Sequence, residues 1–388
     1  MNVLNHDLAA LEAGKADITA REIENQPKVW RKMADMLTER LDDLMSFMET
    51  MRSIPGLRVV FTGAGSSAFI GESMSLLLMA EQGLHSEVVH STEMVATPES
   101  CLYDVPTLLV SYSRSGSSPE SCAAINAAEK NIKELHNLVL VCNADSALAR
   151  YPMDPVGNKV IHIPQEASDQ GFAMTCSVSC MTLATWVLFA GSRAEAKNRI
   201  ACICTLADSV EEQMPALQHH AEAIASFSYE RIVYLGFGAL RGLAREGAVK
   251  SQELTNGLVC AFYDTPTGFR HGPKTVLNDK TLTVMMASPL SLASLYDRDM
   301  IAELCVRRPN HVVVVARDDL PYSVPDADHA VMYRAPDAYH LSEMTAYIFS
   351  LIFLQLVSFE KSLALHVTTD NPCPGGEVNR VVQGVSIH

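Results

Sequence analysis

Short, almost uninterrupted apolar runs alternate along the chain with longer stretches whose apolar residues recur at helical spacing. Residues 107–111 (TLLVS) and 138–142 (LVLVC) are two such runs, and a polar loop followed by the helical stretch CAAINAAEKNI separates them. Strands that lack polar alternation are typical of parallel sheets covered by helices on both faces. The pattern therefore predicts an α/β fold of the doubly wound type.

The same pattern occurs twice. Residues 58–65 (RVVFTGAG) and 231–238 (RIVYLGFG) open alike and lie 173 positions apart. That offset carries the run at 138–142 onto HVVVV at 311–315, and nearly the same offset carries TLLVS onto TLTVM at 281–285. We therefore expect two tandem, flavodoxin-like domains, each with its own parallel sheet.

The remaining stretches predict how these domains are bounded. We expect an N-terminal helical segment at 1–50, a first domain at 51–200 and a second domain at 201–366. The helical stretch between the two sheets lacks the Gly/Ser composition of a flexible linker, which predicts docked domains. Residues 367–388 include the Pro- and Gly-rich sequence DNPCPGG, and we expect this tail to close over the site.

Composition and charge narrow the classes of partner. Hydrophobic residues make up 48% of the chain and charged residues 19%, which excludes a disordered protein. Thirty Lys and Arg stand against 45 Asp and Glu, and the net charge of −15 is spread along the chain. Such a surface repels a polyphosphate backbone, so we expect no nucleic-acid partner and only a small, local basic site.

No segment predicts export or membrane insertion. The start, MNVLNHDLAALEAGKAD, lacks a basic region followed by an apolar core, and the longest apolar candidate, 344–357, contains Gln355 and is predicted to be a buried helix. We therefore expect a cytoplasmic protein without membrane contact. The ten cysteines form no CxxC pair, which predicts reduced, structural thiols and no metal site.

Two polar loops in the first half predict an anion site. The turn GAGSS at 63–67 and the loop SYSRSGSSPES at 111–121 follow two of the predicted strands, and each precedes a helical stretch. Hydroxyls and backbone N–H groups at a helix N-terminus form a phosphate cradle that needs neither metal nor lysine. The alternative is an ordinary Ser/Gly turn in which Ser117 or Ser118 is the N-cap.

The second half offers different chemistry. Its corresponding loop, 287–291 (ASPLS), has few serines, which makes a second phosphate site doubtful. Glu246, Lys250 and Glu253 are four and three residues apart, so they share one helical face, and a lysine between two carboxylates keeps them ionised. His271 precedes a Gly-Pro turn, where an imidazole would be accessible for acid/base work. The alternatives are an exposed ion pair and a loop histidine without a function.

Together these motifs resemble the sugar isomerase (SIS) family with two SIS domains, to which the isomerase half of glucosamine-6-phosphate synthase belongs. GAGSS, SYSRSGSSPES, REGAVKSQEL and RHGPK occur in that order. FYDTPTGFRHGPK and GEVNRVVQGVSI are most similar to the AgaS group of this family. That resemblance implies deamination of galactosamine 6-phosphate with isomerisation to tagatose 6-phosphate; older naming calls the group tagatose-6-phosphate ketose/aldose isomerases.

The resemblance also implies which residues bind the substrate. The positions that match phosphate-binding serines of the synthase, together with their neighbours in the same two loops, are Gly65, Ser66, Ser67, Ser113, Arg114, Ser115 and Ser118. Arg114 stands where the synthase has a glutamine. Thr175 falls near a serine that contacts sugar. Gln383 replaces the lysine that forms a Schiff base with the ketose, so we expect no covalent imine through the tail.

The implied catalytic residues lie in the second half. Glu253 matches the glutamate that moves a proton between C1 and C2 of the open-chain sugar, and Lys250 and Glu246 match its neighbours. His271 matches the histidine associated with ring opening, which comes from the partner subunit in the synthase. A homodimer or larger homo-oligomer is therefore expected.

The chemistry of an amino-hexose 6-phosphate fits these groups without a cofactor. His271 opens the ring, Glu253 shifts the proton through an enolamine, and water hydrolyses the resulting imine to a ketose and ammonia. The sequence leaves open two alternatives: a ketose/aldose isomerase without deamination, and a phosphosugar-sensing protein that binds without turnover. It also leaves open the galacto or gluco configuration of the substrate and the number of subunits.

Overall fold

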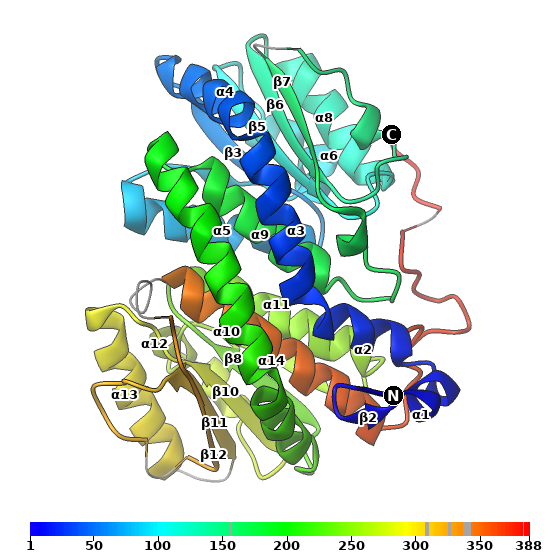
Figure 1. The fold of residues 1–388 in the computed structure, drawn as a ribbon, viewed down its shortest axis with the longest axis vertical. Helices are drawn as coiled ribbons and strands as arrows, with labels where there is room; N and C mark the ends of the chain where they lie inside the picture. Colours follow the sequence, from blue (N-terminus) through cyan, green and yellow to red (C-terminus); the bar gives the residue numbers. More distant parts are fainter. Residues whose placement is uncertain (155–156, 307–309, 325–326, 337–342, 383) are drawn as a thin grey trace. The chain divides into compact units, whose positions relative to one another are not determined.

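The computed structural model describes residues 1–154, 157–306, 310–324, 327–336, 343–382 and 384–388 (Figure 1). The chain forms two compact units, which are described separately. The first-sheet unit comprises Lys28–Asp169, Met174–Cys204 and Gly376–His388. The second-sheet unit comprises Met1–Pro27, Gln170–Ala173 and Thr205–Gly375. The segment boundaries expected at residues 50, 200 and 366 stay predictions.

The first-sheet unit contains a five-stranded parallel sheet in the order β4-β3-β5-β6-β7. Its strands are β3 (Arg58–Thr62), β4 (Glu87–Val88), β5 (Thr107–Ser113), β6 (Leu135–Val141) and β7 (Asn158–His162). Every residue of β3 and β5 is buried, as expected of strands that helices cover on both faces. In chain order the strands read 2-1-3-4-5, which is the predicted flavodoxin-like topology.

Helices pack on each face of this sheet (Figure 1). The helices of this unit are α4 (Leu41–Ser53), α5 (Ser66–Gln82), α6 (Ser91–Ala96), α7 (Pro98–Cys101), α8 (Pro119–Asn131) and α9 (Cys176–Leu188). On one face Val60 and Leu109 pack with residues of α6 and α8. Phe61 alternates to the other face, where its ring meets Tyr112 and Phe189 at centroid distances of 6.2 and 5.5 Å.

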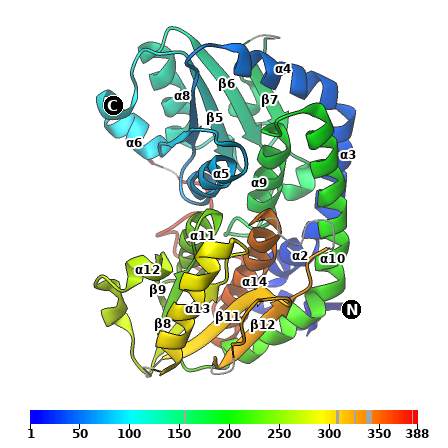
Figure 2. The ribbon, with the colours of Figure 1, turned by 90° about the vertical axis from the view of Figure 1, so that its left-hand side faces the viewer.

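The second-sheet unit repeats this architecture (Figure 2). Its sheet has the order β12-β11-β10-β8-β9, with β8 (Arg231–Leu235), β9 (Cys260–Asp264), β10 (Thr281–Met286), β11 (His311–Arg317) and β12 (His329–Tyr333) all parallel. Its helices include α11 (Ala239–Leu254), α12 (Pro266–Phe269), α13 (Ser291–Val306) and α14 (Glu343–Ala364). The order is again 2-1-3-4-5 in chain terms, so the duplication predicted from the sequence is confirmed.

The two Gly-containing turns confirm the repeat at the level of backbone geometry. Gly65 has φ 56° and ψ −131°, and Gly238 has φ 56° and ψ −132°. A Cβ on Gly63 or on Gly236 would lie 2.7 Å from atoms of the residue four positions later, so each turn approaches its helix too closely for a side chain. Both halves therefore use glycine for the same physical reason.

The apolar helix predicted near 344–357 is α14. By length and composition it could cross a bilayer, but 94% of its apolar window is buried inside the protein. Gln355, the polar residue noted in the sequence, accepts a hydrogen bond from Gln26 Nε2 at 2.7 Å. α14 is therefore a core helix, and it packs against α11 (Figure 2).

The N-terminal residues are divided between the units. β1 (Asn2–Val3) and β2 (His6–Asp7) form an antiparallel hairpin, followed by α1 (Leu8–Gly14) and α2 (Asp17–Glu24), all in the second-sheet unit. α3 (Gln26–Glu39) and the long α10 (Arg193–Ala225) each contain residues of both units. The tail is divided too: the carboxylate of Asp370 accepts hydrogen bonds from Thr19 within the second-sheet unit.

Candidate active site

The serine loop begins inside the first sheet. Ser113 ends β5, is 4% exposed, and accepts a hydrogen bond from Gly116 N at 2.9 Å. Gly116 has φ 62°, and a Cβ there would lie 2.0 Å from Ser146 Oγ. The loop after β6 also supports the serine loop from behind, because Asn143 Nδ2 donates to Ser115 O at 3.3 Å. The loop conformation is thus fixed by contacts within the same unit.

The N-terminus of α8 has no side-chain cap. Ser118 occupies the N-cap position, but its Oγ donates to Ser121 Oγ at 2.6 Å and accepts no helical N–H. Ser115 Oγ accepts from Ser117 N at 3.4 Å, outside the helix. Ser118 is therefore the N-cap residue, as the alternative reading expected, but its side chain makes no capping hydrogen bond. Among the described contacts no side chain accepts from the N–H groups of this first turn, which also contains Glu120, and such groups at the positive end of a helix dipole can bind an anion.

The turn after β3 lies next to the serine loop. β3 and β5 are neighbours in register, with Thr62 opposite Ser111, so the loops that follow them leave the sheet at one edge. Gly65 is the N-cap of α5, and Ser66 and Ser67 form its first turn, each 5% exposed. Ser67 Oγ lies 3.8 Å from Met174 Sδ, which is a weak partner. The structure brings these serines to one edge of the first sheet.

The tail contacts the serine loop through two arginines. Arg114 is 6% exposed and donates from Nη2 to the carbonyl oxygen of Arg380 at 2.7 Å. Arg380 in turn donates from Nη2 to the carbonyl oxygen of Asp169. All three residues belong to the first-sheet unit, so this part of the tail lies on it. Gln383 lies outside the described residues.

Thr175 is buried and bound by a carboxylate that the sequence analysis did not identify. Thr175 is the N-cap of α9 and is 0% exposed. Its Oγ1 donates to Asp169 Oδ1 at 2.8 Å, and Asp169 also accepts from the backbone N–H groups of Thr175, Cys176 and Ser177. The Thr175 hydroxyl is therefore part of the hydrogen-bond network through which Asp169 binds the N-terminus of α9. The position of Asp169, six residues before the N-cap residue Thr175, was the only signal in the sequence.

Glu246, Lys250 and Glu253 come together on α11 in the second-sheet unit. Lys250 is fully buried, and its Nζ lies 3.4 Å from Glu246 Oε1 and donates to Glu253 Oε2. The Glu246 side chain is 1% exposed, whereas that of Glu253 is 29% exposed. The alternative of an exposed surface ion pair is wrong, because the side chains of Lys250 and Glu246 are both buried. A buried ammonium needs close carboxylates to offset its lost hydration. One carboxylate stays accessible at the end of the cluster.

His271 is exposed on the loop after α12. Its backbone N donates to Gly268 O at 2.9 Å, and the adjacent Gly272 has φ 124°. Its charged neighbours are engaged, because Arg270 and Lys274 both pair with Glu303 of α13. Within the described part of the chain the His271 imidazole has no hydrogen-bond partner. No described contact joins His271 to Glu253.

In the second half, carboxylates of the chain itself bind backbone N–H groups in the counterparts of the two polar loops. Glu343 Oε1 accepts from Ala239 N, in the first turn of α11, at 2.7 Å. Asp297 is 0% exposed and accepts from Ser288 N, in the loop after β10, at 2.8 Å. Burial raises the pKa of Asp297 to about 7. Sequence reasoning missed both acids, and its doubt about a second phosphate site stays a prediction.

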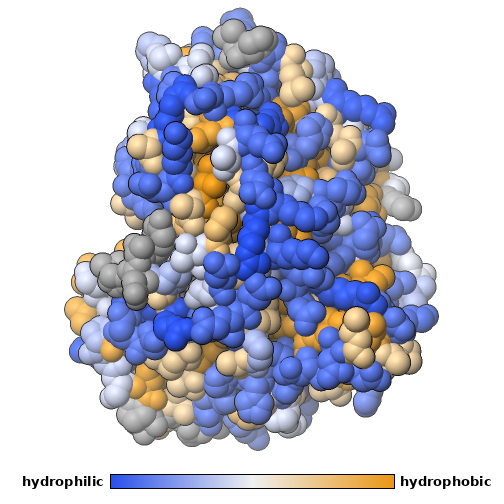
Figure 3. Space-filling model, viewed as in Figure 1, coloured by the Kyte–Doolittle hydropathy of each residue, from blue (hydrophilic) through white to orange (hydrophobic). Residues whose placement is uncertain are grey.

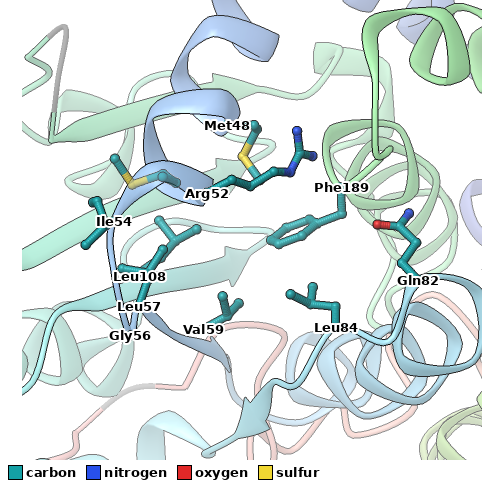
Figure 4. Close-up of a pocket in the computed structure, with 11 residues that line it drawn as sticks. Met48, Arg52, Ile54, Gly56, Leu57, Val59, Gln82, Leu84, Leu108 and Phe189 are labelled. Atoms are coloured by element: carbon teal, nitrogen blue, oxygen red, sulfur yellow. The ribbon is translucent and has the colours of Figure 1, made fainter.

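A separate apolar cavity lies at the opposite edge of the first sheet. Its volume is about 310 Å³, and it is lined at the amino-terminal ends of β3 and β5 by Val59 and Leu108. Figure 4 shows the Phe189 ring pointing toward these aliphatic side chains, and Figure 3 shows apolar side chains beside α4 on the exposed face. Arg52 is the one ionisable residue in its lining. The cavity lacks acid/base pairs, so it is not the candidate active site.

Comparison with known proteins places this chain among two-domain SIS proteins. The SIS domain family matches residues 55–191, which contain the first sheet. A D-galactosamine-6-phosphate deaminase AgaS of Escherichia coli is 35% identical over 95% of this chain and 95% of the relative. A Streptomyces coelicolor protein, provisionally given the same name, is 38% identical with the same coverage of both chains.

A solved structure agrees with these relatives. The crystal structure of tagatose-6-phosphate ketose/aldose isomerase from Escherichia coli has a TM-score of 0.85 and 33% identity, and the match covers 96% of each chain. The duplicated sheets and the serine loop define the class as SIS-fold proteins. Within that class, the chain belongs to the AgaS family.

Proposed function

We propose that this protein is a deaminating isomerase that converts D-galactosamine 6-phosphate and water to D-tagatose 6-phosphate and ammonia. The AgaS relatives named for this deaminase span 95% of the chain, which supports the reaction class and the substrate. The buried Lys250 carries the mechanistic part of the proposal. Its ammonium binds two carboxylates and leaves one of them, Glu253, accessible as a base.

The phosphate-binding role is assigned to the first-sheet unit. The uncapped first turn of α8 and the hydroxyls of Ser67, Ser113, Ser115 and Ser118 supply donors for a phosphate dianion. This binding energy is remote from the reacting carbons, so it can be used for orientation. No metal is needed for either role. Arg114 stands in the same loop, where its guanidinium adds positive charge.

The proton shift is assigned to Glu253. In the open-chain sugar, Glu253 removes the proton from C2 while an acid protonates the C1 oxygen, which gives an enolamine. Glu253 then returns the proton to C1, and the C2 amine becomes an iminium ion. Water adds to C2 and ammonia leaves, so the products are the ketose phosphate and ammonia. His271 is proposed as the acid/base group that opens the ring and protonates the oxygen.

The decisive experiment is to incubate the protein with galactosamine 6-phosphate and to measure ammonia and ketose phosphate separately. The proposal expects both products in equal amounts. Ketose formation without ammonia, from an aldose phosphate, would favour the simple isomerase, a reaction for which one solved neighbour is named. Thermal stabilisation by the sugar phosphate without turnover would favour a sensor.

We also propose a cytoplasmic homodimer or larger homo-oligomer in which His271 acts in the active site of the partner subunit. The exposed imidazole without a described partner in its own chain supports this arrangement. Mixing inactive Glu253→Gln and His271→Ala chains under conditions that exchange subunits is expected to restore activity. If mixed oligomers form and remain inactive, His271 acts within its own chain.

A further inference from the structure

A cluster of ionisable side chains in the second-sheet unit lies outside the proposed active site. His6 belongs to the N-terminal hairpin, Glu222 to α10 and Glu360 to α14. One ligand atom of each residue lies within 4.8 Å of the others, and among the residues that the structure describes this is the one group of three or more such side chains. His6 Nε2 lies 2.7 Å from Glu360 Oε1, and Glu360 is 5% exposed.

The amide of Gln218 points into this cluster. Gln218 precedes Glu222 by one helical turn and is 1% exposed. Its Nε2 lies 2.5 Å from Glu360 Oε1, 3.2 Å from Glu222 Oε1 and 3.5 Å from His6 Nε2. Its Oε1 is buried without a hydrogen-bond partner among the described residues. A buried amide oxygen without a partner is costly, and in this orientation Nε2 rather than the unpartnered Oε1 contacts the three side chains of the cluster.

The charges of the cluster also call for a cation. Two carboxylates converge, and the described part of the chain supplies only imidazoles to pair with them: His6 at Glu360, and the exposed His219, 4.0 Å from Glu222. Lys361 is adjacent to Glu360 in sequence, but its Nζ donates to Ala225 O and Phe227 O instead. Apart from these imidazoles, both carboxylates, those of Glu222 and Glu360, accept hydrogen bonds from the same amide nitrogen, Gln218 Nε2.

We propose that His6, Glu222 and Glu360 form a zinc site, with Gln218 as the fourth ligand. One imidazole and two carboxylates are a donor set that zinc accepts, with bonds of about 2.0–2.2 Å in tetrahedral geometry. Rotation of the Gln218 amide by half a turn exchanges Oε1 and Nε2 and directs the oxygen at the ion. The imidazole ligand favours zinc over magnesium or calcium, which prefer oxygen ligands throughout.

The site is structural and is independent of the proposed reaction. Its ligands come from the N-terminal hairpin, α10 and α14, which are distant in sequence, so a bound ion would fasten the hairpin to the two helices. None of the four residues belongs to the groups to which a catalytic or phosphate-binding role is assigned. Loss of zinc binding and loss of deaminase activity are therefore separate outcomes.

The test measures zinc binding to the full chain after chelator treatment and dialysis. The wild type is expected to bind one equivalent of Zn²⁺, with a melting temperature raised by about 5–10 °C at a hundredfold excess over Kd. Mg²⁺ is expected to leave the melting temperature unchanged. His6→Ala and Glu222→Gln are expected to lose both the bound equivalent and the shift, whereas His219→Ala keeps them.

Glu222→Gln keeps the proposal testable if His6→Ala fails to fold, because the Glu222 side chain is 33% exposed and the substitution keeps its shape. A further control is His220→Ala. His220 of α10 contacts His329 of β12, and this histidine pair is a second place where zinc could bind. Absence of zinc from the wild type, or equal zinc binding by the wild type and Glu222→Gln, would overturn the proposal.

Discussion

Both halves have the same Gly-containing turn after their first strand, but they differ in whether a carboxylate of the chain binds the loops that follow the strands. In the first half, the N-terminus of α8 has no side-chain cap and serines surround it. In the second half, Glu343 binds the turn before α11 and Asp297 binds the loop after β10. A helix N-terminus attracts an anion wherever it is, so an internal carboxylate removes a binding site as effectively as a loss of serines does. The proposed function accordingly assigns anion binding to the first half and acid/base chemistry to the second.

The largest effect is expected from Glu253→Gln, which tests whether the chemistry belongs to the second half. The amide fills the same space but cannot accept a proton, so turnover should fall by about 10²–10⁴-fold. Affinity for the sugar phosphate should stay within a few-fold of the wild type, as measured by calorimetry. Gln252→Ala, an exposed neighbour on α11, is the matched control. Wild-type turnover by Glu253→Gln would remove this residue from the mechanism.

The next effect tests whether phosphate binding belongs to the first half. Replacing Ser67 and Ser118 together by Ala removes two hydroxyls that could donate to the phosphate, at about 1.5–3 kcal/mol for each hydrogen bond to a charged group. KM should rise by about 10²-fold or more. Ser291→Ala, in the corresponding loop of the second half, should leave KM unchanged. An equal rise in KM for both variants would contradict the assignment of the phosphate site to one half.

A third prediction concerns the buried acid of the second half. Because the pKa of Asp297 is raised to about 7, the folded protein keeps a proton that the unfolded chain releases between about pH 4 and 7. The contribution of this group to stability therefore falls as the pH rises through that window, by roughly 1.4 kcal/mol per pH unit, and is constant above it. Tyr322 is the neighbouring ionisable group, and burial raises its pKa above the ordinary value.

Asp297→Asn should remove this dependence, because an amide does not titrate. Urea unfolding between pH 5 and 8 is expected to show a variant that gains stability relative to the wild type as the pH rises. Asp299→Asn, an exposed position on the same helix, is the control. Parallel pH profiles for Asp297→Asn and the wild type would show that the buried carboxyl is not the source.

The smallest effect is expected from Glu343→Gln. The amide oxygen can still accept from Ala239 N, so only the negative charge at the helix N-terminus is lost, which is worth about 1 kcal/mol. The melting temperature should fall by about 2–4 °C. An unchanged melting temperature would mean that the internal anion contributes nothing to the second turn.

Much of the fold could be predicted because it rests on local patterns. The sequences of the buried strands β3 and β5 are nearly continuous apolar runs. The two duplicated turns have glycines at matching positions, Gly63 and Gly236, and each lies against the helix residue four positions later. The Glu246–Lys250–Glu253 cluster was predictable for the same reason, since helical spacing fixes which side chains meet. What the spacing could not predict was that Lys250 is fully buried.

The groups that sequence reasoning missed are isolated acids whose partners lie outside helical or strand spacing, at six to nine positions for Asp169 and Asp297 and at 104 positions for Glu343. Asp169, Asp297 and Glu343 each bind a backbone N–H of another loop or helix, and nothing beside them in the sequence indicates this. Thr175 shows the effect of such a missed acid. The resemblance placed this residue near the sugar, but its hydroxyl donates to Asp169, and no sequence motif indicates that contact. The His6 cluster joins residues more than 200 positions apart and has no local pattern.

The packing of α14 on α11 has a consequence for folding during translation. The helix that carries Glu253 buries one face on α14 and receives the carboxylate of Glu343 at its first turn. α14 lies further along the chain than α11, so it leaves the ribosome later. Until it does, the nascent chain exposes an apolar surface on α11, and a ribosome that stalls between the two helices leaves a chain prone to aggregate.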